Sequence, residues 1–487
     1  MNEWFLPPTQ RPASDGNRVV PRVHGAEYFA RLAEVIGATV AGDQVYFTDW
    51  RGDADELLTP AGPTVGRLLC DAARRGVEVR GLLWRSHSDR TSFSAQENQK
   101  LGEAINDAGG EAMLDERVRR GGSHHQKMVI VRYPERPDDD VAFVGGIDLC
   151  HSRRDDAAHG GDPQVQPIDR RYGARPPWHD AALEIHGPAV ADVLTTFTER
   201  WNDPTPLDHR NPYRRLRQRA AGMPRRPQPL PEVVVPPPPV GNHEVQVLRT
   251  YPKKQPKFPF APDGERSVAH AYERAFARAR RLIYVEDQYL WSGLVARTLA
   301  EALRASPGLQ VIAVVPRFPD QDGAISGPPN RLGQLRAIDL LADAGGHRFA
   351  VYDLENSAGV PVYVHAKICI VDDAWMACGS DNFNRRSWTH DSEITCSVVD
   401  PEGLLPRQLR TRLWAEHLNL PIDEPRLAQV DGALELWRER TTAAQSRARP
   451  HRPAPVSRLN RLWAEPLYRT TYDPDGRPIR LRRGPHF

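Results

Sequence analysis

GGSHHQKMVIV, from Gly121 to Val131, and VYVHAKICIVDD, from Val362 to Asp373, have the same form. Each contains a histidine, one intervening residue, a lysine and then apolar, mostly β-branched residues that favour a buried strand. Because alternate side chains of a strand project to the same face, each histidine is expected beside its lysine. One such motif is a weak signal, since a lone buried histidine usually belongs to the core. Two motifs embedded in a repeat indicate a site.

The sequence around the two motifs repeats in a matching order. The predicted elements are strand Val45–Trp50, helix Leu68–Arg75 and strand Val77–Trp84 in the first half, and strand Leu282–Leu290, helix Leu294–Ala305 and strand Leu309–Val315 in the second. Each half then closes with a helix that carries a tryptophan. This order predicts an internal duplication of an α/β unit, with a mixed, mostly parallel sheet flanked by helices.

A duplicated unit can pair with itself about a pseudo-twofold axis and bring both motifs to one shared cleft. That cleft would hold His125 and Lys127 beside His365 and Lys367. Two ammonium groups create a positive potential that attracts a phosphodiester and lowers the pKa of neighbouring histidines. A neutral imidazole can attack phosphorus, while a second imidazole, kept protonated by a carboxylate, donates to the departing alkoxide.

Acidic and polar residues follow each motif at matching places. Asp180 and Glu393 are the expected orienting partners of the histidines, although both can also be surface residues at strand starts. Ser380 and Asn382 are candidate donors to the non-bridging phosphate oxygens, or else residues that only shape a turn. Asp148 stands in the first half where the second has Asn382, so we include it in the phosphate-binding set.

Composition limits the architecture and the partners. With 487 residues, 40% of them apolar, the chain can form about two or three domains with their own cores. A net charge of only +2 argues against nucleic acid as a partner. A proline-rich stretch predicts a linker over 203–241, between a first half at 1–202 and a second half at 242–422. A basic extension follows at 423–487.

Two arginine-rich segments are candidate contacts with a membrane surface. Tyr213–Arg219 and Asn460–Arg469 interleave arginine with leucine and aromatic residues. The latter lies within Trp437–Phe487, which holds twelve arginines against four acidic residues. Such mixtures suit anionic headgroups or a partner protein, but a solvated basic face explains them equally well. The Asp-Gly pair within Thr470–Phe487 predicts a surface hairpin.

The chain shows no signal peptide pattern and no transmembrane segment, so we expect a cytoplasmic protein that meets membranes only at their surface. Its five cysteines are widely spaced and are predicted to be buried free thiols, which favours a reducing compartment. Neither HExxH nor a CxxC pair is present, so we expect no metal and no cofactor.

The second motif and the residues after it resemble the HxKxxxxD signature of the phospholipase D superfamily. His365–Ile394 contains Asp372 at the acidic position of the signature, a GSxN element that begins at Gly379, and the downstream acid. The first half is similar to the eukaryotic-type branch in HHQKMVIV, in Phe143–Asp155 with its Gly145 and Gly146, and in PPWHDAALEIHGPAVADVL. The resemblance extends from about residue 46 to residue 420 and does not cover either end.

One departure from the signature lies in the first half. The acidic position after Lys127 is occupied by Arg132, and the hairpin that follows is longer than in the second half. In the family this aspartate has a structural role, so its absence affects local geometry more than chemistry. Asp138, Asp139 or Asp140 can substitute for it.

The resemblance implies two phospholipase D-like domains that share one active site and cleave phosphodiesters without a metal. His125 would form a phosphohistidine, and His365 would protonate the leaving head-group alcohol and then activate water or another alcohol. The implied substrates are glycerophospholipids, and the chain is expected to act as a monomer. Three alternatives remain: a nucleic-acid phosphodiesterase, a cardiolipin-synthase-type phosphatidyltransferase, and a lapsed repeat that only binds membranes or partners.

Overall fold

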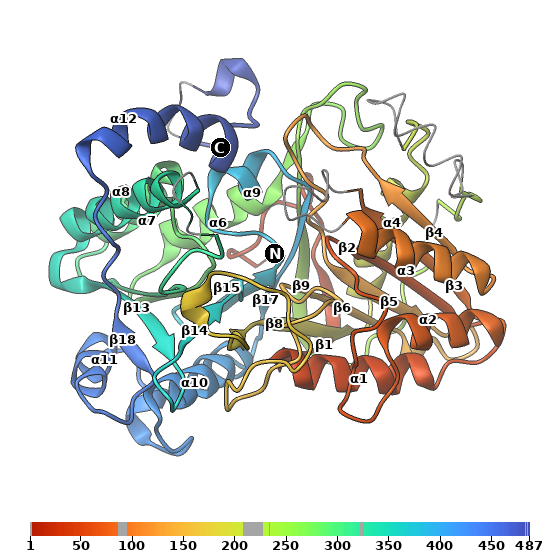
Figure 1. Cartoon of the computed structure of the whole chain (residues 1–487), viewed down its shortest axis with the longest axis horizontal. Coiled ribbons are helices and arrows are strands. Elements are labelled where there is room, and N and C mark those ends of the chain that lie inside the picture. The colour runs from red at the N-terminus through yellow and green to blue at the C-terminus, as the bar shows by residue number, and fades with distance from the viewer. Residues whose placement is uncertain are drawn as a thin grey trace.

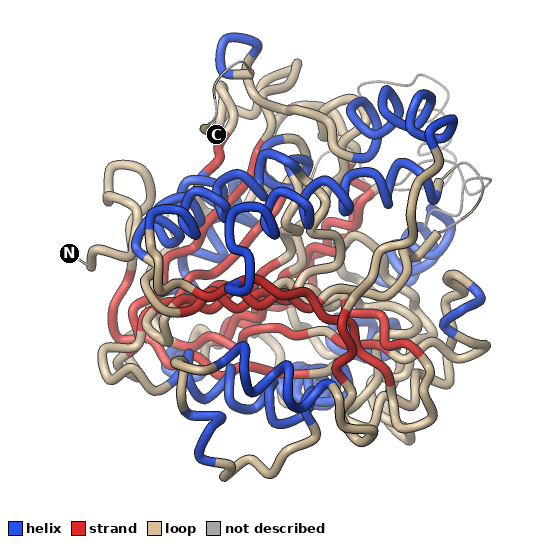
Figure 2. The backbone as a smooth tube through the Cα atoms, turned by 90° about the vertical axis from the view of Figure 1, so that its left-hand side faces the viewer, coloured by secondary structure: helices blue, strands red, loops and turns tan. Residues whose placement is uncertain are grey.

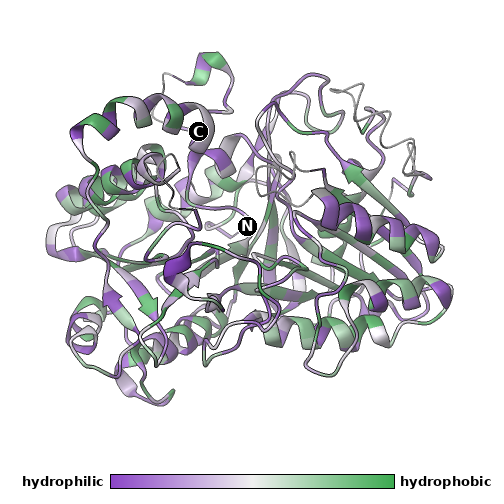
Figure 3. Cartoon of the chain, in the orientation of Figure 1, coloured by the Kyte–Doolittle hydropathy of each residue, from purple (hydrophilic) through white to green (hydrophobic). Residues whose placement is uncertain are grey.

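The computed structural model describes residues 2–85, 95–207, 227–232, 234–321, 323, 326–482, 484 and 486–487. Two β-sheets form the centre, one from each half of the chain (Figure 1), and helices cover them above and below (Figure 2). The strands are mostly apolar, whereas the outer helices have apolar and polar sides (Figure 3). The arginine-rich segment Tyr213–Arg219, which belongs to the proline-rich linker, lies outside the described residues.

The first sheet contains seven strands from the N-terminal part of the chain. Their spatial order is β4 (Glu111–Asp115), β3 (Glu78–Trp84), β2 (Gln44–Asp49), β5 (Met128–Arg132), β6 (Val141–Gly145), β8 (Ala181–His186) and β1 (Ser14–Val23). The pairs β2–β3 and β3–β4 are parallel, and the other pairs are antiparallel.

The second sheet repeats this order strand for strand. It runs β13 (Phe349–Glu355), β12 (Gln310–Val314), β11 (Leu282–Glu286), β15 (Ile368–Val371), β16 (Trp375–Gly379), β17 (Glu393–Val399) and β9 (His243–Tyr251). Again only the first two pairs are parallel. The predicted duplication and mixed sheet are therefore confirmed, but antiparallel pairs make up more of each sheet than we expected.

Matching helices follow matching strands. They are α1 (Gly25–Gly37), α2 (Val65–Arg74), α3 (Ala95–Asp107) and α4 (Ala189–Trp201) in the first half, and α6 (Ser267–Arg278), α7 (Gly293–Ala305), α8 (Gly327–Gly345) and α10 (Leu405–Leu418) in the second. Helix α2 begins after Thr64, whose hydroxyl accepts a hydrogen bond from the amide of Arg67. Trp201 of α4 and Trp414 of α10 are fully buried in one core cluster that both sheets share.

The two sheets meet through equivalent strands. Strands β6 and β8 lie against β16 and β17, and the N-terminal part of β1 pairs with β9. Within each sheet, one glycine allows two neighbouring strands to approach closely. An added Cβ at Gly145 would lie 2.4 Å from Ala182 Cα, and one at Gly379 would lie 2.3 Å from Thr395 Oγ1. The core is continuous across the junction, so the halves form one body.

The C-terminal residues pack onto the second half. Short elements here and elsewhere are β7 (Trp178–His179), β10 (Glu265–Arg266), β14 (Pro361–Val364), β18 (Ala448–Pro450), α9 (Arg385–Thr389), α11 (Ala433–Thr441), α12 (Arg458–Leu467) and η6 (Tyr468–Tyr472). Strand β18 pairs with β13. The predicted hairpin after Thr470 is wrong: the described residues there form the end of η6 and the turn η7 (Ile479–Leu481). None of the described helices has the length and apolarity of a membrane span.

Candidate active site

Both HxK motifs lie in extended segments directly before a strand, not within the strand as predicted. His125 and Lys127 precede β5, and His365 and Lys367 lie between β14 and β15. The amide of His125 donates to the carbonyl of Ser392 at 2.9 Å, and the amide of His365 donates to the carbonyl of His179 at 2.7 Å. Each motif is therefore held by the backbone of the other half.

The two histidines also exchange carboxylate partners between the halves. His125 Nδ1 lies 2.9 Å from Glu393 Oε2, and His365 Nδ1 lies 2.6 Å from Asp180 Oδ2. Both carboxyl groups are buried. With Nδ1 engaged in this way, each ring keeps Nε2 for a ligand. Both histidines line the same cleft, which encloses about 1440 Å³ including its open mouth.

The lysines occupy matching positions beside the histidines. Lys127 Nζ donates to the carbonyl of His125 at 3.2 Å, and Lys367 Nζ donates to the carbonyl of His365. Lys127 also pairs with Asp148 at 3.2 Å, while Lys367 contacts Gln288 Oε1 at 3.3 Å. Burial, and then the charge of Lys127, lowers the pKa of Lys367 to about 8.

The surroundings of His365 disfavour the protonated form of its ring. Burial lowers the pKa of His365 well below its usual value, and the charges of Lys367 and Arg153 lower it further. We expected the carboxylate to keep this imidazole protonated, and the structure indicates the opposite. Burial also raises the pKa of Asp180, against the lowering effect of Lys367.

The predicted phosphate ligands differ in their access to the cleft. Ser380 is fully buried and donates its hydroxyl to Glu393 Oε2 at 2.6 Å, so its only proton is already used. Asn382 lines the cleft. Asp148 also lines it, but this carboxylate is paired with Lys127 and Arg153. Burial alone would raise the pKa of Asp148, and these two cations hold it well below the usual range.

The acidic residue of the second signature has a structural position. Asp372 accepts hydrogen bonds from the amides of Arg280, Arg281 and Leu282 at 2.8, 2.9 and 2.8 Å, which fixes the start of β11. In the first half Arg132 pairs with Asp140, whose carboxylate also accepts the amide of Tyr133. That hairpin is thus closed within itself.

Several residues that support the site were not predicted from the sequence. Asp49 ends β2 and Asp287 follows the equivalent strand β11, and they accept the amides of Leu149 and Phe383 at 2.7 and 2.8 Å. An acid at the end of a buried strand was the available signal. Gly146, by contrast, belongs to the glycine pair that the sequence predicted, and it sits against Asp180, because an added Cβ there would lie 2.2 Å from Asp180 Oδ1. The aromatic lining was also missed; it includes Trp50, Trp84, Trp178, Tyr289, Trp291 and Tyr363.

Arg153 was not predicted either, although a guanidinium group can bind a phosphate through two hydrogen bonds. Its guanidinium lies 4.1 Å from the ring centroid of Trp178 and 3.2 Å from Asp148 Oδ2. Trp178 in turn lies beside His365, with 5.2 Å between the ring centroids. Arg153 lines the cleft and therefore adds a positive group to the two lysines that lie beside the histidines.

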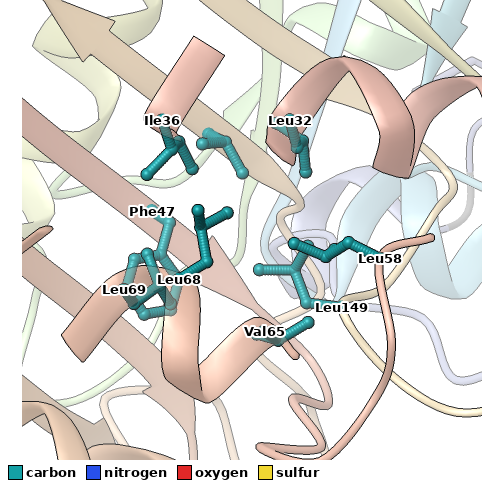
Figure 4. Close-up of a pocket in the computed structure, with 9 residues that line it drawn as sticks. Leu32, Ile36, Phe47, Leu58, Val65, Leu68, Leu69 and Leu149 are labelled. Atoms are coloured by element: carbon teal, nitrogen blue, oxygen red, sulfur yellow. The ribbon is translucent and has the colours of Figure 1, made fainter. Parts of the chain in front are cut away.

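A separate apolar gap lies in the first half under α1 and α2 (Figure 4). Its lining consists of aliphatic side chains and Phe47. Without polar groups to orient a ligand, it is a packing defect of the core and not a second site.

Similarity to known proteins agrees with this geometry. The duplicated α/β unit with two HxK histidines on one cleft is the arrangement that the sequence resemblance implies. Family models match both halves, the phospholipase D model at 41–212 and the cardiolipin synthase PLD-like domain at 308–413. The chain belongs to the phospholipase D superfamily, in its eukaryotic-type branch.

Relatives include phospholipase D alpha 1 of Zea mays, 26% identical over 85% of this chain, and phospholipase D alpha 2 of Arabidopsis thaliana, 27% identical over 74%. The chain spans only 66% and 59% of the length of these two relatives. Phosphatidylserine synthase of Haemophilus influenzae Rd KW20 shares the fold, with a TM-score of 0.54, 14% identity, and coverage of 88% of this chain and 94% of that one.

Proposed function

We propose that the chain cleaves the phosphodiester of glycerophospholipids, or transfers their phosphatidyl group, in the manner of a phospholipase D. One observation carries the proposal: two imidazoles on a single cleft, each with a carboxylate at Nδ1 and a lysine beside it. The names of the plant relatives support a lipid substrate.

The reaction proceeds in two displacements at phosphorus. Nε2 of His125 attacks the phosphorus atom, the bond to the head-group oxygen breaks, and the departing alkoxide takes a proton from Nε2 of His365. Neutral His365 then removes a proton from water or an alcohol, whose oxygen displaces His125 and releases the product. The choice of His125 as nucleophile follows the family resemblance, since the carboxylate exchange makes the two rings equivalent in geometry.

The substrate itself supplies the charge that this mechanism needs. In the empty cleft, burial, Lys367 and Arg153 keep the pKa of His365 low. A bound phosphodiester carries a negative charge that offsets these cations, so the pKa of His365 rises and the ring takes up the proton it later donates. Lys127, Lys367 and Arg153 stabilise the charge on the non-bridging oxygens, and Asn382 can donate to them.

A lipid surface is the proposed location of the substrate. Leu459 and Leu462 of α12 are 77% and 76% exposed, and Trp463 beside them is also exposed. Helix α12 continues directly into η6, where Thr471 and Tyr472 line the cleft. Apolar side chains next to the mouth of the cleft would enter the headgroup region and bring the phosphodiester to the histidines.

Both halves and the tail contribute to this cleft, so we retain 1–202 and 242–422 as one catalytic unit of a monomer. The proline-rich stretch 203–241 is retained as its linker. The extension 423–487 is proposed to serve the membrane surface and the rim of the cleft. A nucleic-acid substrate has no specific support among the described residues, because the cleft cations are matched by Asp148, Asp180 and Asp391.

The test is to incubate the purified protein with vesicles of mixed phospholipids and ethanol, and separately with single-stranded DNA. Free head group together with phosphatidylethanol is the expected result, and both must disappear in His125→Ala and His365→Ala variants that melt at nearly the same temperature as the wild type. Cleaved DNA with intact lipid would overturn the proposal. So would near wild-type activity in either variant.

A further inference from the structure

A second polar cluster lies buried behind the candidate active site. Its members are His24, His159, His179 and Glu416, which come from the end of β1, the loop before β7, β7 itself and α10. One ligand atom from each residue lies within 4.8 Å of the others. The three histidines are buried, and the Glu416 side chain is 11% exposed. These residues come from four segments that are far apart in the sequence, so no short sequence motif indicates the cluster.

The spacing of the cluster fits a four-coordinate metal ion. His24 Nε2 lies 2.8 Å from Glu416 Oε2, His159 Nε2 lies 2.9 Å from Glu416 Oε1, and His179 Nδ1 lies 4.0 Å from the same oxygen. A tetrahedral ion with bonds of about 2.0–2.1 Å separates its ligand atoms by roughly 3.3 Å. The observed distances lie on both sides of that value, so small side-chain shifts suffice.

Two of the histidines have the outer hydrogen bonds that metal ligands require. His159 Nδ1 lies 3.1 Å from the carbonyl of Trp178, and His179 Nε2 lies 2.7 Å from Glu286 Oε2. These bonds point the opposite nitrogen of each ring into the cluster. There, His179 Nδ1 is fully buried and has no hydrogen-bond partner among the described residues. A buried imidazole nitrogen without a partner is costly, and a metal ion would satisfy it.

The backbone at His24 is a further sign of constraint. This residue has φ of 72° and ψ of 147°, a conformation that side-chain-bearing residues rarely adopt. Its amide donates to the carbonyl of Asp180 at 2.8 Å, which directs the ring toward Glu416. Strain of this kind persists where the surrounding structure requires it, often at a binding site.

We infer that His24 Nε2, His159 Nε2, His179 Nδ1 and the Glu416 carboxylate bind a divalent transition-metal ion of the zinc class. Three imidazoles and a carboxylate favour zinc and its neighbours over magnesium or calcium. All four positions are filled by protein, so the ion is structural and takes no part in the phosphoryl chemistry. Glu286, which accepts from His179 Nε2 and from His417 Nε2 at 2.7 and 2.8 Å, places a further negative charge behind His179 that offsets the charge of the ion.

The position of the cluster indicates which part of the structure the ion would stabilise. The carbonyl of His179 accepts the amide of His365, and the next residue, Asp180, holds the His365 ring. Glu416 comes from the second half, whereas the three histidines come from the first. An ion here ties the halves together directly behind one of the two catalytic imidazoles.

The test measures metal content and metal affinity on the full chain. Protein purified without chelator and dialysed should contain about one equivalent of zinc or a related metal. After chelation, added Co²⁺ should give the visible absorption of a tetrahedral site, and added Zn²⁺ should raise the melting temperature. His159→Asn and Glu416→Gln should lose the metal, while His186→Asn, which alters a buried histidine paired with Glu184 outside the cluster, should keep it.

Folded wild-type protein with less than about 0.1 equivalent of any transition metal, and no cobalt spectrum after titration, would overturn the inference. Retention of metal by a folded Glu416→Gln or His159→Asn variant would overturn it as well. The cobalt titration needs no variant, so a variant that fails to fold leaves the result decisive. None of these readouts depends on phospholipid cleavage.

Discussion

Each histidine of the two HxK motifs takes its carboxylate from the repeat to which it does not belong. Asp180 of the first half binds His365, and Glu393 of the second binds His125. Loss of one carboxylate therefore disables the ring of the other half, because the ring loses both its orientation and the group that stabilises its protonated form.

Asp180→Asn should lower kcat by about 10²–10⁴-fold with little change in KM, because the amide no longer holds the tautomer in which Nε2 of His365 can react. Steady-state kinetics with a short-chain phospholipid measures the effect. Glu184→Gln is the matched control, since Glu184 is a buried carboxylate beside His186 away from the cleft. Equal losses in the two variants would contradict a specific role for Asp180.

Ligand binding should also be linked to proton uptake. Burial, and then Lys367, lowers the pKa of His365 in the empty cleft, and a bound anion raises it. At neutral pH the binding of inorganic phosphate should therefore take up as much as about one proton, and affinity should weaken as pH rises. Calorimetry in buffers of different ionisation enthalpy measures this number. Proton release on binding would contradict the assigned charge state, and His365→Asn should abolish the uptake.

At the scale of elements, apolar runs predicted the strands well, and polar segments defeated prediction. The run at Val45–Trp50 gives β2, with bounds shifted by one residue. Strand β1 was missed because Gly16 and Pro21 interrupt a sequence in which only three of ten residues are buried. The described residues after Thr470 form no hairpin, since Asp473 there accepts the amide of Arg385 and the hydroxyl of Tyr468. Such long-range contacts leave no local pattern.

Gly379, where the end of β16 pairs with β17, should tolerate no side chain. An added Cβ would lie 2.3 Å from Thr395 Oγ1 and 2.5 Å from the carbonyl of Ile394, so the strands β16 and β17 would have to separate. We expect Gly379→Ala to lower the free energy of unfolding by about 1–3 kcal/mol, measured by chemical denaturation. Gly293→Ala is the control, because a Cβ there has nothing within 4 Å. Similar stability of both variants would contradict the packing described for this turn.

Helix α12 should matter for lipid surfaces and not for chemistry. Leu462→Asp together with Trp463→Ala removes exposed apolar side chains from the helix that leads into the cleft lining at Thr471, so binding to phospholipid vesicles should fall several-fold. Cleavage of a dispersed short-chain phospholipid should stay unchanged. Flotation and kinetics measure the two quantities, with Ile422→Asp as the control for an exposed apolar residue elsewhere. Unchanged vesicle binding would contradict the proposed role of α12.

At the scale of the whole molecule, sequence symmetry predicted which residue types meet but not how they meet. The repeated HxK motifs and downstream acids were recognisable because each occurs twice. The exchange of carboxylates, the position of Arg153 and the buried cluster around Glu416 depend on how the two sheets dock. Docking is set by side chains such as Met376 and Leu183 in the shared core, whose partners lie far along the chain.

The central claim is that two imidazoles act on one phosphorus atom, and a crystal structure with vanadate tests it most directly. The account predicts a single vanadium atom in the cleft, bonded to Nε2 of one histidine, with an apical oxygen within hydrogen-bond distance of Nε2 of the other. Lys127 and Lys367 should lie beside its equatorial oxygens. Separate oxyanions at His125 and His365, or rings too far apart to share one, would contradict the account.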